Sequence, residues 1–121
     1  MIDLIVTKLK THANLKNVVA FGSALPSPPY TVVKAETTNL GFVRYRINAH
    51  MAIGQQTALD TYIRKDVYNL LHNVVLSGVG ADTRKYIIRA DPDNSIGQVV
   101  MSNSDGTISQ DRVFRAPEVQ D

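Results

Sequence analysis

The residue types that most often perform catalysis are present in this chain, but their spacing does not arrange them for it. No two of the three histidines, His12, His50 and His72, have the spacing of metal ligands, so we expect each to lie at the surface or at a helix end. Residues 22–24, Gly-Ser-Ala, lack the second glycine of a nucleophile elbow. The chain has no cysteine, which removes thiolate nucleophiles and thiolate metal ligands. The sequence therefore predicts neither an enzyme nor a bound cofactor or metal ion.

Two short segments begin like ligand-binding loops and then depart from the pattern. Asp91, Asp93 and Ser95 stand two residues apart, as the first ligands of a calcium loop do. Ser102 occupies the position that needs a bidentate glutamate, so we expect a turn that ends a strand. Residues 78–80, Gly-Val-Gly, are too short for a phosphate-binding loop and lack the Lys-Ser/Thr pair that follows one. Neither segment predicts a site.

The one pattern typical of a binding module is residues 41–45, Gly-Phe-Val-Arg-Tyr. It matches the second half of the core segment of an RNA-recognition motif, in which aromatic residues on a sheet stack against bases. The first half is not matched, and strand alternation places Phe42 and Tyr45 on opposite faces, where they cannot form one stacking platform. A small nucleic-acid-binding domain that uses Phe42, Arg44 and Arg46 stays open as an alternative.

These residues belong to a long predicted strand with two different faces. Apolar residues recur at every second position and predict a buried face: Val43, Tyr45, Ile47, Ala49, Met51 and Ile53. The residues between them predict a polar, partly cationic face: Arg44, Arg46, Asn48 and His50. Arginines in a row are suited to pairing with the carboxylates of a neighbouring subunit. These four residues are therefore the candidate subunit interface, which charge reversal at Arg44 and Arg46 should disrupt while the monomer stays folded.

An amphipathic helix follows this strand. Apolar residues spaced three and four apart predict a helix over residues 57–73, with Asp66 as its one polar interruption on the apolar side. Thr57 is the predicted cap, and Asp60 is the predicted acidic partner of a capping box. At about 1.5 Å per residue the helix is roughly 25 Å long, which is enough to cover the apolar face of the strand.

The remaining elements complete a predicted α+β fold. A short helix over residues 2–9 begins the chain. Strands are predicted at residues 18–22, 30–36, 43–53, 86–90, 98–102 and 107–116. A turn predicted at residues 37–39 joins the second and third of these strands, so we expect them to form an antiparallel hairpin. The predicted fold class is a mainly antiparallel β-sheet packed against one long and one short α-helix, in the order α-β-β-β-α-β-β-β. We expect a single domain over residues 1–116 and a flexible tail over residues 117–121.

Composition is ordinary for a soluble globular protein. The chain has 121 residues, of which 44% are hydrophobic and 20% charged, which argues against wholesale disorder. The formal net charge of +2 is too weak to indicate a nucleic-acid or membrane partner by itself. No segment approaches the ~20 apolar residues that cross a bilayer, and Lys8, Lys10 and His12 interrupt any apolar leader at the N-terminus. We therefore expect no membrane partner.

Three segments together resemble a known family. They are residues 29–33 (Pro-Tyr-Thr-Val-Val), the alternating strand at 43–51, and Leu59, Asp60, Tyr62 and Ile63 leading to Leu70 and Leu71. In this order they resemble the tail-terminator, or tail-completion, proteins of long-tailed bacteriophages. The resemblance covers most of residues 1–116.

The resemblance implies an α+β subunit that forms a six-fold ring on the end of the tail tube, stops tube growth and joins tail to head. The implied partners are further copies of the chain, the tail tube protein and a head-completion or connector protein, while DNA only passes through the channel. The implied location is the head-proximal end of the tail in the virion, after synthesis in the host cytoplasm. No cofactor or catalytic residue is implied. Another head–tail connector of the neck stays open as an alternative.

Overall fold

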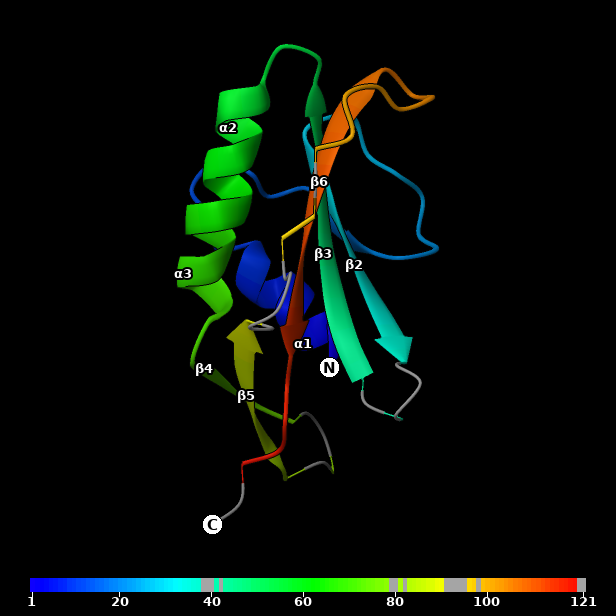
Figure 1. The fold of residues 1–121 in the computed structure, drawn as a ribbon. Coiled ribbons are helices and arrows are strands. Elements are labelled where there is room, and N and C mark those ends of the chain that lie inside the picture. Colours follow the sequence, from blue (N-terminus) through cyan, green and yellow to red (C-terminus); the bar gives the residue numbers. More distant parts are fainter. Residues whose placement is uncertain are drawn as a thin grey trace.

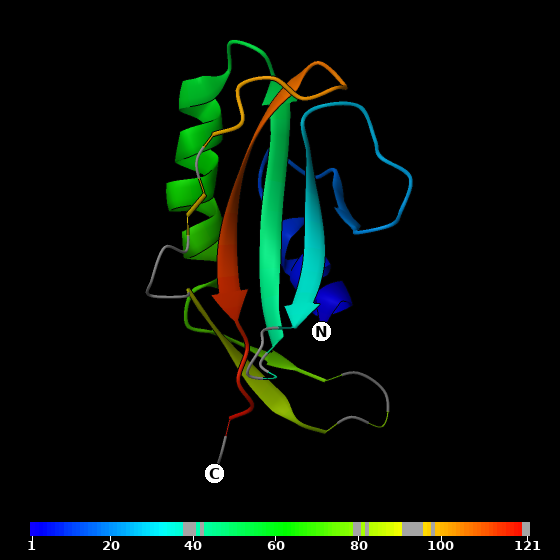
Figure 2. The same ribbon diagram turned by 45° about the vertical axis from the view of Figure 1, so that its right-hand side comes forward.

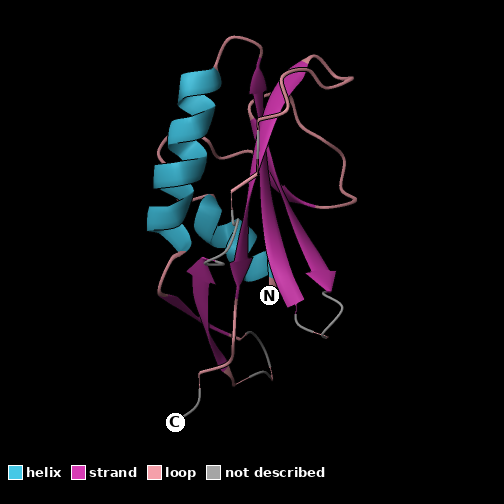
Figure 3. Ribbon diagram, viewed as in Figure 1, coloured by secondary structure: helices cyan, strands magenta, loops and turns pink. Residues whose placement is uncertain are grey.

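A curled sheet carries all the helices on one of its faces (Figures 1 and 3). The structure is a computed structural model, which describes residues 1–37, 41, 43–78, 81, 83–90, 96–97 and 99–119. Its elements are α1 (Ile2–Leu9), β1 (Val18–Ala20), β2 (Tyr30–Thr37), β3 (Val43–Ala52), α2 (Gln56–Thr61), the π-helical segment η1 (Tyr62–Asp66), α3 (Val67–Leu71), β4 (Val74–Ser77), β5 (Lys85–Ala90) and β6 (Thr107–Arg115). The segments α2, η1 and α3 follow one another without a break and form one long helix.

The described strands form a mixed sheet in the order β1-β2-β3-β6-β5-β4. β1 pairs with β2 in parallel, and every other neighbouring pair is antiparallel. Figure 2 shows β2, β3 and β6 side by side in front of the helices, while the β4–β5 hairpin extends beyond the end of the long helix. The sheet curls into a half-barrel, and strands account for 41% of the described residues against 23% for helices.

The predicted fold class is wrong in two respects. The sheet is mixed, because β1 and β2 run in parallel. The loop between them returns the chain to the end of the sheet at which β1 began, so β2 starts at that same end. The order of the elements also differs from the predicted one. β4 forms directly after the long helix, where the β-branched Val74 and Val75 favour a strand. The described part of the predicted strand at residues 98–102 is not a strand, because only Val100 there forms an isolated bridge to β6; Ile96, just before it, forms another.

The predicted alternation of the long strand is present in β3, although it does not extend to both ends. Ile47, Ala49 and Met51 are buried against the helices. Val43 and Ile53 were expected to be buried and are exposed, because neither helix covers the strand at those positions. β2 and β3 form the expected antiparallel hairpin. Residues 38 and 39 of the predicted turn lie outside the described residues.

The hydrophobic core lies between the sheet and the helices. α1 contributes Ile5 and Leu9 to it. The long helix and the strands contribute the remaining buried residues: Leu59, Tyr62, Ile63, Val67, Leu71, Val18, Val33, Ile47, Ala49, Met51, Ile88, Ile108 and Phe114. Each large aliphatic side chain buried in this way contributes about 1.5–3 kcal/mol relative to an exposed one.

The predicted capping of the long helix is wrong. The helix begins at Gln56 with Gln55 as its N-cap, and no side chain caps it. Asp60 instead accepts a hydrogen bond from Nε of Arg64, one turn further on, at 2.7 Å. The helix ends at Leu71, where Asn73 adopts a positive φ of 61°. Within the described residues no helix combines the length and the apolar character needed to cross a membrane.

A buried arginine from β6 accompanies the π-helical segment. Nη1 of Arg112 donates to the carbonyl oxygens of Ile63 at 3.4 Å and Arg64 at 3.1 Å. The guanidinium lies over the rings of Tyr68 at 4.7 Å and Phe114 at 5.7 Å. Burial lowers the pKa of Arg112, although the group stays charged at any physiological pH. The widened turn thus presents two main-chain carbonyls to a cation on the sheet.

Asp66 interrupts the apolar side of the helix because it binds a histidine. Nε2 of His12 lies 2.9 Å from Oδ2 of Asp66. Nδ1 of the same ring accepts the backbone N–H groups of Asn14 and Leu15. Because Nδ1 is an acceptor, the proton of the neutral ring is on Nε2 and is donated to Asp66. His12 therefore connects the segment after α1 to the long helix.

Candidate docking surface

All four predicted interface residues lie on the face of the sheet opposite the helices, which we call the outer face. The strand register places three residue pairs next to one another on this face: Tyr30 with His50, Val32 with Asn48, and Lys34 with Arg46. The same alternation places Asp111, Val113 and Arg115 of β6 beside β3 on this face. One face of the sheet therefore packs against the helices and forms the core, whereas the outer face is open to solvent.

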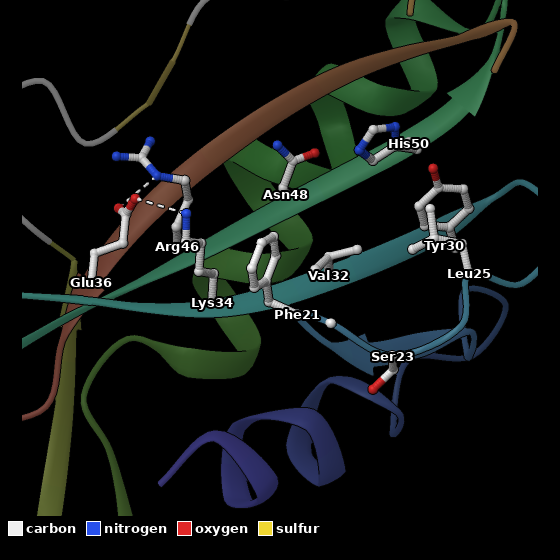
Figure 4. Close-up of a pocket in the computed structure, with 11 residues that line it drawn as sticks. Phe21, Ser23, Leu25, Tyr30, Val32, Lys34, Glu36, Arg46, Asn48 and His50 are labelled. Carbon is white, nitrogen blue, oxygen red and sulfur yellow. Dashed lines mark hydrogen bonds and ion pairs between the residues drawn. The ribbon is translucent and has the colours of Figure 1, made fainter. Parts of the chain in front are cut away.

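A groove of about 470 Å³ lies on the outer face, between the strands and the loop that follows β1 (Figure 4). We call it the outer groove. Phe21 and Leu25 line it from the loop, and the outer-face residues of β2 and β3 from residue 30 to 36 and from 46 to 50 form its floor. The groove therefore contains three of the four predicted interface residues. Arg44, the fourth, is exposed beyond its end.

The loop side of the outer groove is apolar and exposed. Phe21 is 65% exposed and Leu25 is 59% exposed. Nζ of Lys34 lies 4.6 Å from the centre of the Phe21 ring. Figure 4 shows Phe21 beside Val32 and Lys34, and Leu25 beside Tyr30. Two large apolar side chains exposed on one rim of a groove are typical of a surface that binds another protein. Sequence reasoning missed both: Phe21 was placed in the strand predicted at residues 18–22, which ends at Ala20, and Leu25 lies in a proline-rich loop that has no periodic pattern.

Arg46 already has counter-charges within its own chain. Its Nε donates to Oε1 of Glu36 at 2.8 Å, and its Nη1 donates to Oδ2 of Asp111 at 3.0 Å. Burial acts to lower the pKa of Arg46, but the two carboxylates outweigh it and leave that pKa raised. Glu36 also lies 3.9 Å from Nζ of Lys34. This end of the outer groove is therefore a nearly neutral ion-pair cluster within one chain, whereas the sequence predicted that the arginines pair with carboxylates of a neighbouring subunit.

The other end of the outer groove is polar and lies beside one carboxylate, that of Asp105. The ring of His50 stacks on Tyr30 with 4.6 Å between centroids, and its Nδ1 lies 3.1 Å from Oγ1 of Thr107. Burial lowers the pKa of His50, so the ring is neutral at pH 7. Tyr30 donates its hydroxyl to Oδ2 of Asp105 at 2.7 Å, and burial together with that carboxylate raises the pKa of Tyr30 to about 12. Oδ1 of Asn48 is buried without a hydrogen-bond partner among the described residues.

Gly97 leaves space for the carboxylate that binds Arg46. A Cβ atom at position 97 would overlap Oδ1 of Asp111, whose carboxylate holds Arg46. We expect Gly97→Ala to displace that carboxylate and to lower the free energy of unfolding by about 1 kcal/mol, because a hydrogen bond between charged groups contributes about 1.5–3 kcal/mol and the partial exposure of Arg46 and Asp111 to solvent reduces that value. Urea denaturation measures the change. Ser102→Ala, at an exposed position nearby, should change stability by less than about 0.5 kcal/mol and is the control; equal stability of both variants would contradict the expectation.

The described residues contain no cluster suited to holding a metal ion, since no three histidine or acidic side chains come together there. A second cavity of about 540 Å³ is bordered by His12, Asp66 and Tyr62. Both ring nitrogens of His12 are already hydrogen-bonded, one to Asp66 and the other to backbone amides. The imidazole therefore has no nitrogen left to act on a substrate in this arrangement. The outer groove is the stronger candidate site.

Compared with models of known protein families and with curated protein sequences, the chain matches none of them.

Proposed function

We propose that the chain is a structural subunit that assembles with its own copies into a ring, caps a bacteriophage tail tube, ends its polymerisation and joins tail to head. The observation that carries the proposal is the outer groove, in which exposed Phe21 and Leu25 stand over a floor made by β2 and β3. Residues 30–33 belong to the segment that carries the resemblance, and they lie in β2. The sequence that suggests the family therefore belongs to the strand that forms the groove.

A closed ring needs two different patches on each subunit, because its contacts are heterologous. The outer groove supplies one patch. The second is at the end of the molecule where β3 leads into α2. There Ile53 is 62% exposed, and Met101 is 54% exposed, with its Sδ 3.7 Å from Nε2 of Gln56. We call Ile53 and Met101 the tip patch. In the proposed ring, the tip patch of one subunit enters the outer groove of the next.

The test uses two variants that each lose one patch. Phe21→Ser with Leu25→Ser removes the apolar rim of the groove, and Ile53→Ser with Met101→Ser removes the tip patch. All four side chains are exposed, so we expect each variant to melt like the wild-type chain. Light scattering and negative-stain microscopy should show rings for the wild-type chain and monomers for each variant. An equimolar mixture of the two variants should give dimers, because one intact groove and one intact tip patch then remain.

Two further observations decide the experiment. Val75→Ser, at an exposed position on β4 away from both patches, is the matched control and should keep the ring. A wild-type chain that stays monomeric both alone and with purified tail tubes would contradict the proposal. Charge reversal at Arg46 is not a clean probe, because it would place a third carboxylate beside Glu36 and Asp111 in the monomer itself.

A further inference from the structure

Two hydrogen-bond acceptors in the outer groove have no donor among the described residues. The first is Oδ1 of Asn48, which is buried without a hydrogen-bond partner. A buried acceptor without a donor costs folding energy, so proteins seldom keep one unless it serves another purpose. Figure 4 shows this oxygen turned toward the ring of His50, two residues further along β3. The second acceptor belongs to that ring.

The acceptor on His50 is Nε2, because a series of hydrogen bonds fixes the ring proton on Nδ1. The carboxyl group of Asp105 is ionised, since the hydrogen bond from Thr107, above all, holds its pKa below the ordinary value. Oγ1 of Thr107 donates its one hydrogen to Oδ1 of Asp105 at 2.5 Å. Oγ1 can therefore only accept from Nδ1 of His50, which lies 3.1 Å away. Nε2 of the neutral ring is then a bare acceptor, and no described residue donates to it.

A donor of the kind that these acceptors lack lies beside the tip patch. Gln56 is the first residue of α2 and is exposed, and its Nε2 lies 3.7 Å from Sδ of Met101. A thioether is a weak acceptor, so both N–H groups of this amide remain available to a stronger one. The segments that carry the tip patch, residues 52–58 and 99–104, contain no charged residue. The tip is therefore an uncharged surface on which an amide accompanies apolar side chains.

We propose that the side-chain amide of Gln56 of one subunit donates hydrogen bonds to Asn48 and His50 in the outer groove of the next. The inference rests on the proposed ring and names the polar contact by which one subunit recognises the other. A primary amide carries two N–H donors on one nitrogen. Residues two apart on a strand are about 7 Å apart, so one amide placed between the two acceptors can reach both. The apolar rim of the groove then covers the tip patch.

An uncharged donor fits the outer groove better than a charged group does. The carboxylates of Glu36 and Asp111 already bind Arg46, and that of Asp105 already accepts hydrogen bonds. An incoming cation would therefore lose water without gaining a free counter-ion. An incoming carboxylate would place a negative charge against two acceptors. Of the four candidate interface residues, the two neutral ones therefore carry the contact.

The first test replaces the donor by an acceptor of the same shape. Gln56→Glu turns the amide into a carboxylate, and an acidic residue in the first turn of a helix does not destabilise the monomer. Sedimentation velocity at a series of concentrations gives the concentration at which half of the chains are in rings. We expect Gln56→Glu to raise this concentration at least about tenfold, because both acceptors stay unsatisfied and face a negative charge.

Gln55→Glu is the matched control, because it adds the same charge one residue earlier. Gln55 is also exposed, but it borders the second cavity, beside His12. We expect Gln55→Glu to assemble at the wild-type concentration.

The second test uses Asn48→Leu, which should change folding and assembly in opposite directions. The substitution removes a buried acceptor that has no donor in the monomer, so its melting temperature should equal or exceed that of the wild-type chain. Its rings should nevertheless need a higher concentration to form. Asn48→Leu combined with Gln56→Met should assemble at a lower concentration than Gln56→Met alone, because the double variant leaves Asn48 and Gln56 neither unsatisfied nor buried against an apolar partner.

Failure of this inference is distinguishable from failure of the proposed ring. A wild-type chain that forms no ring overturns both. A ring that Gln56→Glu leaves unchanged, or that Gln55→Glu weakens equally, overturns the inference alone. So does a lower melting temperature of Asn48→Leu, which would make Asn48 a residue that the fold itself needs. A double variant that assembles no better than Gln56→Met also overturns the inference and leaves the ring intact.

Discussion

Replacing Arg112 with alanine should lower the free energy of unfolding by about 3 kcal/mol. Two hydrogen bonds from a charged donor are lost, and each contributes about 1.5–3 kcal/mol. Part of this loss is offset, because the variant no longer has to remove a cation from water when it folds. The carbonyl oxygens of Ile63 and Arg64 would lose their donor from the sheet. They belong to the π-helical segment, whose widened turn meets Arg112. Urea denaturation followed by circular dichroism measures the loss. Loss of Arg112 should also accelerate hydrogen exchange, relative to the wild-type chain, by a larger factor at the amides of η1 than at the amides of α1.

A second substitution separates the charge from the volume of Arg112. Methionine fills similar space but donates no hydrogen bond, so we expect Arg112→Met to be less stable than the wild-type chain by about 1–2 kcal/mol. In other proteins, apolar residues that replace a buried ion pair can raise stability, because ions are costly to remove from water. A methionine variant as stable as the wild-type chain would therefore show that desolvation outweighs the two carbonyl contacts. That result would contradict the prediction.

The parts of this fold that follow from local periodicity could be predicted. Alternation along β3 identified Ile47 and Ala49 as buried and placed Arg46 on the other face, because a strand has a period of two residues whatever it pairs with. The hairpin of β2 and β3 followed from the same signal. The parallel pairing of β1 could not be predicted, because its direction depends on the path of a proline-rich loop that has no period. The start of β4 was missed because the helical pattern continues to Leu71, close to where the strand begins.

The face of the sheet on which the four candidate interface residues lie follows from alternation, whereas the partners of Arg46 do not. Arg46 was expected to pair with carboxylates of a neighbouring subunit, and it binds Glu36 and Asp111 of its own chain. The first partner could have been found from the hairpin register, since Glu36 lies opposite Arg44, two residues from Arg46. The second could not, because Asp111 is 65 residues away in the sequence. Likewise, the π-helical turn depends on Arg112, which no local pattern near Ile63 reveals.

Replacing Phe114 with alanine should be the most destabilising single change, at about 3–5 kcal/mol, the range for a fully buried phenylalanine. The total stability expected for 121 residues is about 6–18 kcal/mol, at 0.05–0.15 kcal/mol per residue. Phe114 is fully buried on β6, opposite Tyr45 of β3 and Ala90 of β5. Its ring also lies 5.7 Å from the guanidinium of Arg112. The measurement is urea denaturation, with Val100→Ala at an exposed position as control; a loss below about 1.5 kcal/mol would contradict the prediction.

The position of Phe114 also predicts where the weakened protein opens first. β5 pairs with β6 through Arg89–Arg115 and Ala90–Phe114, and residues 117–119 continue that pairing along β5. Loss of the ring should therefore loosen the β4–β5 hairpin before the β2–β3 hairpin, which has its own long register. Amides of residues 85–90 should exchange faster in Phe114→Ala by a larger factor than those of residues 30–37. Equal acceleration of exchange in both hairpins would show that the sheet opens as one unit.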